Sequence, residues 1–173
     1  MTTVLVTGPI GGGKSTACRY FESLGWPVYD SDSRCKALYD SVPGLKGRIE
    51  SELGIPFAEL GLIFSRPALR ERLEGIVYPL VAEDIASWKA AVGGPLAFVE
   101  SATAAAHPEF ANLYDKVLIV TAPAQLRHAR NPKAAERDAS QRFPRIPGSR
   151  TIRNEGSPEQ LYAKLDNYLK TIL

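Results

Sequence analysis

The segment from Gly8 to Ser15 is rich in glycine and ends in a lysine followed by a hydroxyl side chain. It fits the pattern G-x-x-x-x-G-K-[ST], which forms a loop that holds phosphate groups. Glycines let the backbone curl so that successive N–H groups point into one concavity, and the positive end of a following helix faces the same place. Lys14 would reach the β- and γ-phosphates, and the Ser15 hydroxyl would bind the bridging magnesium ion.

This pattern predicts a P-loop that binds a nucleoside triphosphate and Mg²⁺. The alternative is a glycine-rich turn with an accidental Lys-Ser pair, which is disfavoured because the run before the loop predicts a buried strand and the run after it a helix. The predicted nucleotide-binding residues are Gly8, Gly11, Gly12, Gly13, Lys14, Ser15 and Thr16, of which Lys14 is also a catalytic residue and Ser15 also a metal ligand.

Asp30 and Asp32 follow a short apolar segment over residues 27–29. If that segment is a strand of the same parallel sheet, its carboxyl end faces the same crevice as the P-loop. A carboxylate there can accept the proton of an attacking hydroxyl and orient its oxygen toward the γ-phosphate. Asp32 is the candidate base, although either aspartate could instead cap the helix expected from Ser33.

The P-loop alone does not choose among GTPases, transport and motor ATPases, and small-molecule kinases. The sequence contains neither an Asn-Lys-x-Asp guanine motif nor an Asp-x-x-Gly switch, and its 173 residues are too few for a large ATPase module. These absences leave a compact kinase that uses ATP.

The formal net charge of +2 gives no argument for a nucleic-acid or membrane partner. Basic charge is concentrated between Arg127 and Arg153, where seven arginines and Lys133 occur with only two acids, so this segment suits an anion-facing lid.

Cys18 and Cys35 fit neither a disulfide framework nor a zinc site, and no run approaches the ~18 apolar residues of a membrane span. We expect a soluble cytoplasmic protein, monomeric or weakly self-associating.

Strands and helices are expected to alternate along the chain. Apolar or β-branched runs predict strands over residues 3–7, 27–29, 96–100, 116–121 and 151–153, and helical periodicity predicts helices over 14–24 and 161–173. Residues 33–92 read as mainly helical, with breaks at 43–44, 54–56, Gly61 and Pro79. This alternation predicts a single α/β domain with a five-stranded parallel sheet flanked by helices and ligands at the carboxyl ends of the strands.

The order of motifs resembles that of the dephospho-CoA kinases. The segments that carry the resemblance are Gly8 to Ser15, Val28 to Asp32, Ala68 to Arg70, Pro79 to Val81, Phe98 to Ala102, Asp115 to Val120, Arg130 and Asn154 to Ser157. It therefore spans nearly the whole chain. The P-loop is specific only to the class, whereas the order and spacing of the other segments point to the family.

Enzymes of that family transfer the γ-phosphate of ATP to the ribose 3′-hydroxyl of dephospho-coenzyme A, the last step of coenzyme A biosynthesis. The resemblance implies that Asp32 is the base toward this hydroxyl and that Arg70 contacts the acceptor. It also implies that Glu100 lies on the substrate side of the site and holds the magnesium ion through water.

The resemblance further implies that Arg130 is a catalytic residue on a lid and that Asn154 and Gly156 border the adenine of ATP by their backbone. The expected division is a core over 1–32, 93–125 and 150–173, a helical acceptor-binding insert over about 33–92, and a lid over about 126–149. His107 and His128 match no metal-ligand spacing, so neither is given a role.

Several positions depart from the family pattern: Tyr78-Pro79 replaces the usual His-Pro, Thr103 to Ala106 replaces a Leu-Leu-Phe-Glu-like run, and Asn131 and Arg153 stand where Asp is usual. Ordinary structural roles also remain open: Arg70 could pair with Glu74, Glu100 could be a plain strand-end acid, and Arg130 a surface charge. The alternative functions are another P-loop small-molecule or nucleoside kinase, or a catalytically silent nucleotide-binding regulatory module.

Overall fold

The computed structural model describes residues 1–140, 143 and 145–173. Within these residues, five parallel strands form one sheet in the order β2-β3-β1-β4-β5. The strands are β1 (Thr2–Thr7), β2 (Val28–Asp30), β3 (Leu96–Glu100), β4 (Lys116–Thr121) and β5 (Arg150–Arg153). The predicted α/β fold and parallel sheet are confirmed, with strand ends within one residue of the sequence prediction.

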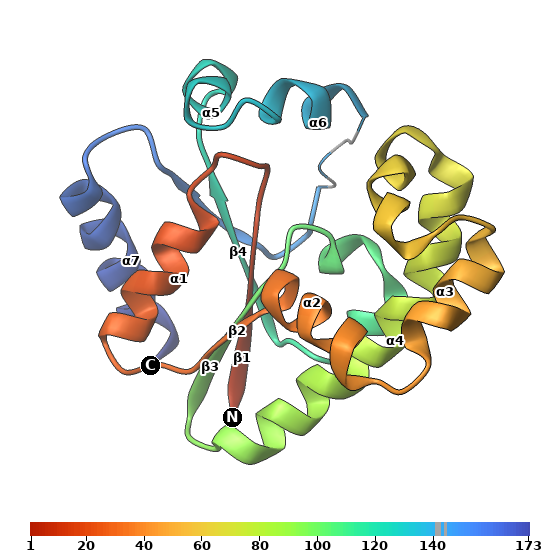
Figure 1. Ribbon diagram of the computed structural model, residues 1–173. Coiled ribbons are helices and arrows are strands. Elements are labelled where there is room, and N and C mark those ends of the chain that lie inside the picture. The colour runs from red at the N-terminus through yellow and green to blue at the C-terminus, as the bar shows by residue number, and fades with distance from the viewer. Residues whose placement is uncertain (141–142, 144) are drawn as a thin grey trace.

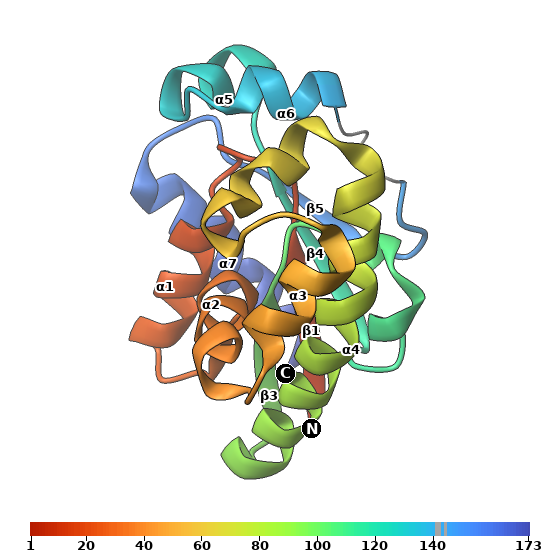
Figure 2. The same cartoon turned by 45° about the vertical axis from the view of Figure 1, so that its right-hand side comes forward.

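Helices cover both faces of the sheet (Figure 1). They are α1 (Lys14–Ser23), α2 (Ser31–Ser41), α3 (Leu45–Leu53), the 3₁₀ segment η1 (Phe57–Ser65), α4 (Pro67–Val92), the short 3₁₀ turns η2 (Ala104–Ala106) and η3 (Pro108–Phe110), α5 (Ala124–Arg130), α6 (Ala134–Ser140) and α7 (Pro158–Ile172). Helices α1 and α7 lie on one side, while α2, α3 and α4 lie on the other, and α5 and α6 cross the end where the strands finish (Figures 1 and 2).

Strand β1 shows why the sequences of the central strands are unbroken apolar runs. Val4 and Val6 are fully buried in the core formed with α1 and α7, while Leu5 is fully buried in the opposite core with α4. Successive side chains of a strand point to opposite faces, so a strand covered on both sides needs apolar residues at every position. The stacked rings of Phe21 and Phe98, with centroids 3.9 Å apart, bind α1 to β3 on the first side.

Helix α4 differs from the sequence prediction because it continues through Pro79. A proline inside a helix removes one hydrogen bond and crowds the carbonyl four residues earlier, at a cost of about 3 kcal/mol. The helix buries Leu73, Ile76, Val77, Val81 and Ile85 against the sheet. Since each fully buried aliphatic side chain contributes about 1.5–3 kcal/mol, this burial outweighs the proline.

Helix α2 begins at Ser31, two residues earlier than predicted, because Asp30 is its N-cap. The Asp30 carboxylate accepts hydrogen bonds from the backbone N–H groups of Asp32 and Ser33 at 3.0 and 3.3 Å. Further along, Arg34 donates two hydrogen bonds to Asp84 of α4, at 2.8 and 2.7 Å. The Tyr29 hydroxyl, from β2, donates to the same carboxylate at 2.6 Å, so Asp84 connects α2, β2 and α4.

Residues 141, 142 and 144, which fall in the predicted lid, lie outside the described residues. In the remainder of that segment, Arg127 is only 9% exposed and donates two hydrogen bonds to Asp138, at 2.8 and 2.9 Å. One of the arginines that made the segment look like an anion-facing surface is therefore a buried link between α5 and α6. Within the described part of the chain, none of the helices has the length and apolar character needed to cross a bilayer.

Candidate active site

The P-loop connects β1 to α1 at the carboxyl end of the sheet and packs tightly on its neighbours (Figure 1). Gly13 is the N-cap of α1 and has a φ of 106°, in the left-handed region that favours glycine. A Cβ at Gly13 would collide with the side-chain amide of Asn154, and one at Gly8 would collide with the carbonyl of Val120. Both glycines are needed because other main-chain and side-chain groups approach the loop closely.

Lys14 is folded against its own loop. Its Nζ donates to the carbonyl oxygens of Gly8 at 2.9 Å and Pro9 at 3.3 Å. Burial lowers the pKa of Lys14 below its ordinary value, partly opposed by the nearby carboxylates of Glu100 and Asp32. The two carboxylates predicted from the ends of β2 and β3 are therefore close enough to the P-loop lysine to act on its charge.

Ser15 and Glu100 come together although they are far apart in the sequence. The Ser15 hydroxyl donates to Glu100 Oε1 at 2.7 Å. Burial raises the pKa of Glu100, and the hydrogen bond from Ser15 opposes that rise. A hydroxyl and a carboxylate side by side are oxygen ligands of the kind that Mg²⁺ prefers.

The part of the chain that the structure describes contains no cluster of three or more His, Cys, Asp and Glu side chains that could hold a metal ion. A magnesium ion beside Ser15 and Glu100 would thus take most of its ligands from phosphate oxygens and water. Mg²⁺ in nucleotide sites is bound in that way, so the two residues fit the ion.

Asp30 and Asp32 have different surroundings. Asp30 caps α2, as described above, and its other carboxylate oxygen accepts a hydrogen bond from the Ser33 hydroxyl at 2.6 Å. Asp32 lies in the first turn of the same helix and is exposed. The capping role that the sequence left open for either residue belongs to Asp30, which leaves the Asp32 carboxylate directed to solvent near Lys14.

Arg130, at the end of α5, bridges the P-loop and the segment after β5. Its guanidinium donates to the carbonyl oxygens of Gly11 at 3.3 Å and Asn154 at 3.0 Å. The side chain of Asn154 in turn donates to the Gly12 carbonyl at 3.1 Å. Arg130 is exposed, but its guanidinium is attached to the P-loop, and the Asn154 side chain contacts the same loop.

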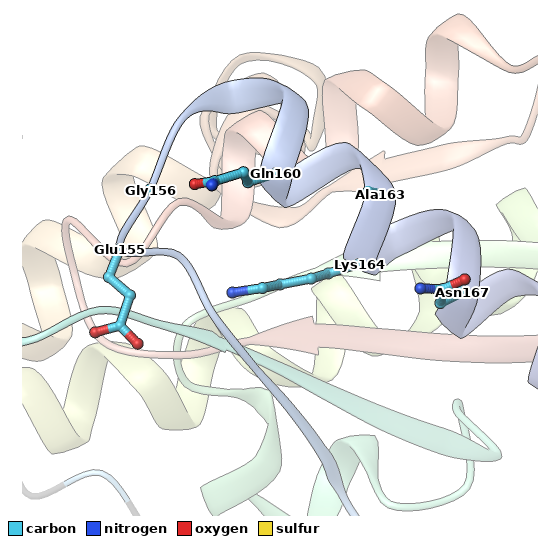
Figure 3. A pocket seen from close by; sticks show the side chains of 6 residues that line it. All are labelled: Glu155, Gly156, Gln160, Ala163, Lys164 and Asn167. Atoms are coloured by element: carbon cyan, nitrogen blue, oxygen red, sulfur yellow. The ribbon is translucent and has the colours of Figure 1, made fainter.

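A hollow of about 420 Å³ opens beside the Asn154 to Ser157 segment, between that loop and α7 (Figure 3). Glu155 and Gly156 line it from the loop, and Gln160, Ala163, Lys164 and Asn167 line it from the helix. The Gln160 side chain accepts a hydrogen bond from the Ser157 N–H at 3.0 Å and lies against Gly156, where a Cβ would collide with it. A side chain at position 156 would therefore have to displace the Gln160 amide that caps α7.

Arg70 lies on α4 and donates to Glu74 Oε1 at 2.9 Å, the pairing that the sequence offered as its ordinary role. Two of the departures from the family pattern also meet here: the Tyr78 hydroxyl is 3.0 Å from the Thr103 hydroxyl and donates to Glu74 at 3.2 Å. The ring of His107 packs edge-on against Tyr78, with centroids 4.6 Å apart.

Sequence reasoning missed the contacts of Arg127 and His128. The Arg127 guanidinium donates to the carbonyl of Ala122 at 3.0 Å and to that of Ile10 in the P-loop at 3.4 Å, in addition to Asp138. His128 Nε2 is 2.9 Å from the same Asp138 carboxylate. No local pattern signals these pairs, because the partners lie on different turns of different elements.

The sequence is 37% identical over 149 residues to a dephospho-CoA kinase of Porphyromonas gingivalis, a match that covers 81% of this chain and 72% of the relative. The chain belongs to the dephospho-CoA kinase family. A dephospho-CoA kinase of Cereibacter sphaeroides is 34% identical over 135 residues, covering 72% of this chain and 67% of that protein. No family model matches the sequence.

Solved structures agree with the family assignment at the level of the fold. TT1252 from Thermus thermophilus superposes with a TM-score of 0.75 at 26% identity, over 99% of this chain and 98% of the other. A dephospho-CoA kinase from Campylobacter jejuni superposes with a TM-score of 0.65 at 19% identity, over 98% and 96% of the two chains. The kinase architecture therefore extends over the whole length of this family member.

Proposed function

We propose that this chain is a dephospho-CoA kinase that transfers the γ-phosphate of ATP to the 3′-hydroxyl of dephospho-coenzyme A. The observation that carries the proposal is the 2.7 Å contact between Ser15 and Glu100 beside Lys14, in a chain 37% identical to a kinase of that name. It joins the P-loop to the end of β3, where a magnesium-bound triphosphate and an acceptor hydroxyl would meet.

The proposed roles combine the family resemblance with the geometry of the site. Backbone N–H groups of the P-loop, with Lys14, hold the phosphates of ATP, and the helix α1 directs its positive end at them. Ser15 and, through water, Glu100 hold the magnesium ion, which neutralises charge on the phosphates when it is bound. Asp32 accepts the proton of the acceptor hydroxyl and orients its oxygen. Asn154 and Gly156 border the adenine.

Arg130 stabilises charge that develops on the transferring phosphoryl group. Its present partners are the carbonyl oxygens of Gly11 and Asn154, which are weaker acceptors than phosphate, so the guanidinium can turn to the nucleotide when ATP binds. Arg70 contacts the acceptor from α4. In this scheme α2 to α4 bind the acceptor and α5 and α6 form the lid.

Turnover tests the proposal directly. Purified protein with Mg-ATP is given dephospho-coenzyme A, a nucleoside or no acceptor, and ADP release is measured and the phosphorylated product identified by mass. We expect dephospho-coenzyme A to raise ADP release well above background hydrolysis. Phosphorylation of the nucleoside alone would contradict the acceptor while leaving a P-loop kinase, and absence of any acceptor-dependent turnover would point to a silent nucleotide-binding module.

A further inference from the structure

A connected set of polar side chains lies between α4 and the segment that follows β3. Its centre is the Glu74 carboxylate, whose side chain is 19% exposed. Arg70 donates to Glu74 Oε1 at 2.9 Å, Tyr78 donates to the same oxygen at 3.2 Å, and His107 Nε2 is 3.9 Å from Oε2. The Tyr78 hydroxyl also lies 3.0 Å from the hydroxyl of Thr103.

The direction of these hydrogen bonds follows from counting protons. A phenol has one proton, and an ionised carboxylate can only accept, so Tyr78 donates its proton to Glu74. The Thr103 hydroxyl must then donate to the Tyr78 oxygen. Burial raises the pKa of Tyr78 to about 12, so the phenol keeps its proton at neutral pH. The bonds run from Thr103 through Tyr78 to Glu74, which Arg70 meets from the other side.

Thr103 is itself held at the end of β3. Its N–H and that of Ala104 donate to the Ser101 hydroxyl at 3.3 and 3.1 Å, and the N–H of Ser101 donates to the Val6 carbonyl of β1 at 3.1 Å. The Tyr78 ring is packed edge-on between His107 and Phe110, with centroids 4.6 and 5.2 Å away. The ring contacts and the hydrogen bond to Thr103 therefore fix the Tyr78 hydroxyl in place. Through Thr103 and Ser101, its position depends on the end of β3, the strand that carries Glu100.

We propose that Tyr78 is a positioning residue that acts through Glu74 to orient Arg70 toward an anionic group of the acceptor. This proposal rests on the proposed function, in which Arg70 contacts dephospho-coenzyme A. A carboxylate that accepts only from Arg70 can rotate with it, whereas one that also accepts from a fixed phenol holds the guanidinium in one place. Orientation before binding lowers the entropic cost of engaging the acceptor.

The test is a kinetic comparison of Tyr78→Phe with the unmodified protein. We expect the KM for dephospho-coenzyme A to rise about five- to thirtyfold, less than the loss of a direct hydrogen bond to a charged group because Arg70 keeps its own bond to Glu74. The KM for ATP and kcat at saturating acceptor should stay nearly unchanged. In the double variant, Tyr78→Phe should add little to the rise in acceptor KM caused by Glu74→Gln, because both substitutions weaken the same Tyr78–Glu74–Arg70 interaction.

Thr103 provides an independent variant that does not alter the packed ring. Thr103→Val removes the hydroxyl but keeps a side chain of similar shape. It should raise the acceptor KM about two- to fivefold, as expected for the loss of a neutral hydrogen bond. Thr103→Ser keeps the hydroxyl and should leave the acceptor KM near that of the unmodified protein. Tyr20→Phe is the matched control, since it also breaks a bond from tyrosine to a carboxylate, at 2.7 Å to Asp166, but on the opposite side of the sheet. It should leave the acceptor KM unchanged.

The outcomes separate this inference from the proposed function. If the unmodified protein phosphorylates dephospho-coenzyme A and Tyr78→Phe retains its acceptor KM, only the role of Tyr78 is overturned. The same conclusion follows if Tyr78→Phe lowers kcat and both KM values change together, or if its effect adds fully to that of Glu74→Gln. If the unmodified protein does not use dephospho-coenzyme A, the proposed function is wrong and the acceptor role of Arg70 is overturned with it.

Discussion

Asp30 and Asp32 allow folding and chemistry to be separated by single substitutions. The Asp30 carboxylate accepts from the backbone N–H groups at the start of α2 and from the Ser33 hydroxyl, whereas Asp32 is exposed in the first turn. We expect Asp32→Asn to lower kcat for dephospho-coenzyme A by about 10² to 10⁴, the range for a positioned general base. That range corresponds to about 3–5 kcal/mol on the activation barrier.

Substitution of Asp30 should affect stability more than substitution of Asp32, the reverse of the order expected for kcat. Asp32→Asn removes one negative charge from the first turn of α2, which costs about 0.3–1 kcal/mol. Asp30→Ala removes the N-cap and should cost about 1–2 kcal/mol, which lowers Tm by about 2–8 °C for a chain of this length. Asp30→Asn is the matched control, because asparagine caps a helix about as well as aspartate while it cannot act as a base.

Each variant is measured for ADP release at saturating ATP and acceptor, for ATP binding, and for Tm. The reasoning requires that Asp32→Asn loses kcat with little change in ATP binding and that Asp30→Asn keeps it. If Asp30→Asn loses kcat while Asp32→Asn keeps it, the base is the other carboxylate. If neither loses kcat, the phosphoryl transfer in this protein uses a different base.

Three further substitutions test other parts of the site and the fold. Lys14→Ala should lower kcat/KM by on the order of 10² to 10³, as for loss of one preorganised donor, and near-normal turnover would refute the P-loop role. Asp138→Asn should lower the free energy of unfolding at neutral pH, because the pKa of Asp138 is lowered to about 2 by its partners in the folded state. In urea unfolding, the loss of free energy relative to the unmodified protein should persist above pH ~4 and shrink as the pH falls toward 2. A loss that stays constant down to pH ~2 would contradict this. Gly47→Ala in α3, where a Cβ meets nothing within 4 Å, should raise the free energy of unfolding by about 0.5–1 kcal/mol, and an unchanged Tm would count against it.

The elements that the sequence predicted correctly are those whose signal is local. The buried strands are unbroken apolar or β-branched runs, and the P-loop is a fixed pattern between a strand and a helix, so both can be recognised without knowledge of the rest of the chain. The break at Pro79 was wrong because proline disfavours a helix locally, while burial of the apolar side of α4 depends on the sheet that it packs against. Local sequence contains no information about that sheet.

The residues of the site were found to different extents for the same reason. The family resemblance implied that Ser15 and Glu100 serve one magnesium site, and their contact is explained by the pairing of β1 with β3, whose ends lie at one edge of the sheet. The burial of Arg127 against Asp138 and the bond between Tyr78 and Thr103 depend on how separate elements pack. A count of charges along the chain treated Arg127 as surface charge, and no pattern in the sequence distinguishes it from the exposed arginines around it.

Helix α4 connects the two sides of the proposed reaction. Its N-terminal half carries Arg70 and Glu74, and its later turns carry Asp84, which accepts two hydrogen bonds from Arg34 of α2. Asp32 lies on α2, two residues before Arg34. Arg70, the proposed acceptor contact, thus lies on α4, and Asp32, the proposed base, lies on a helix that is bonded to α4. Asp84 also accepts a hydrogen bond from Tyr29 of β2, and α4 continues through Pro79 as a single element, so α2 and α4 are both held against the sheet whose edge carries the P-loop.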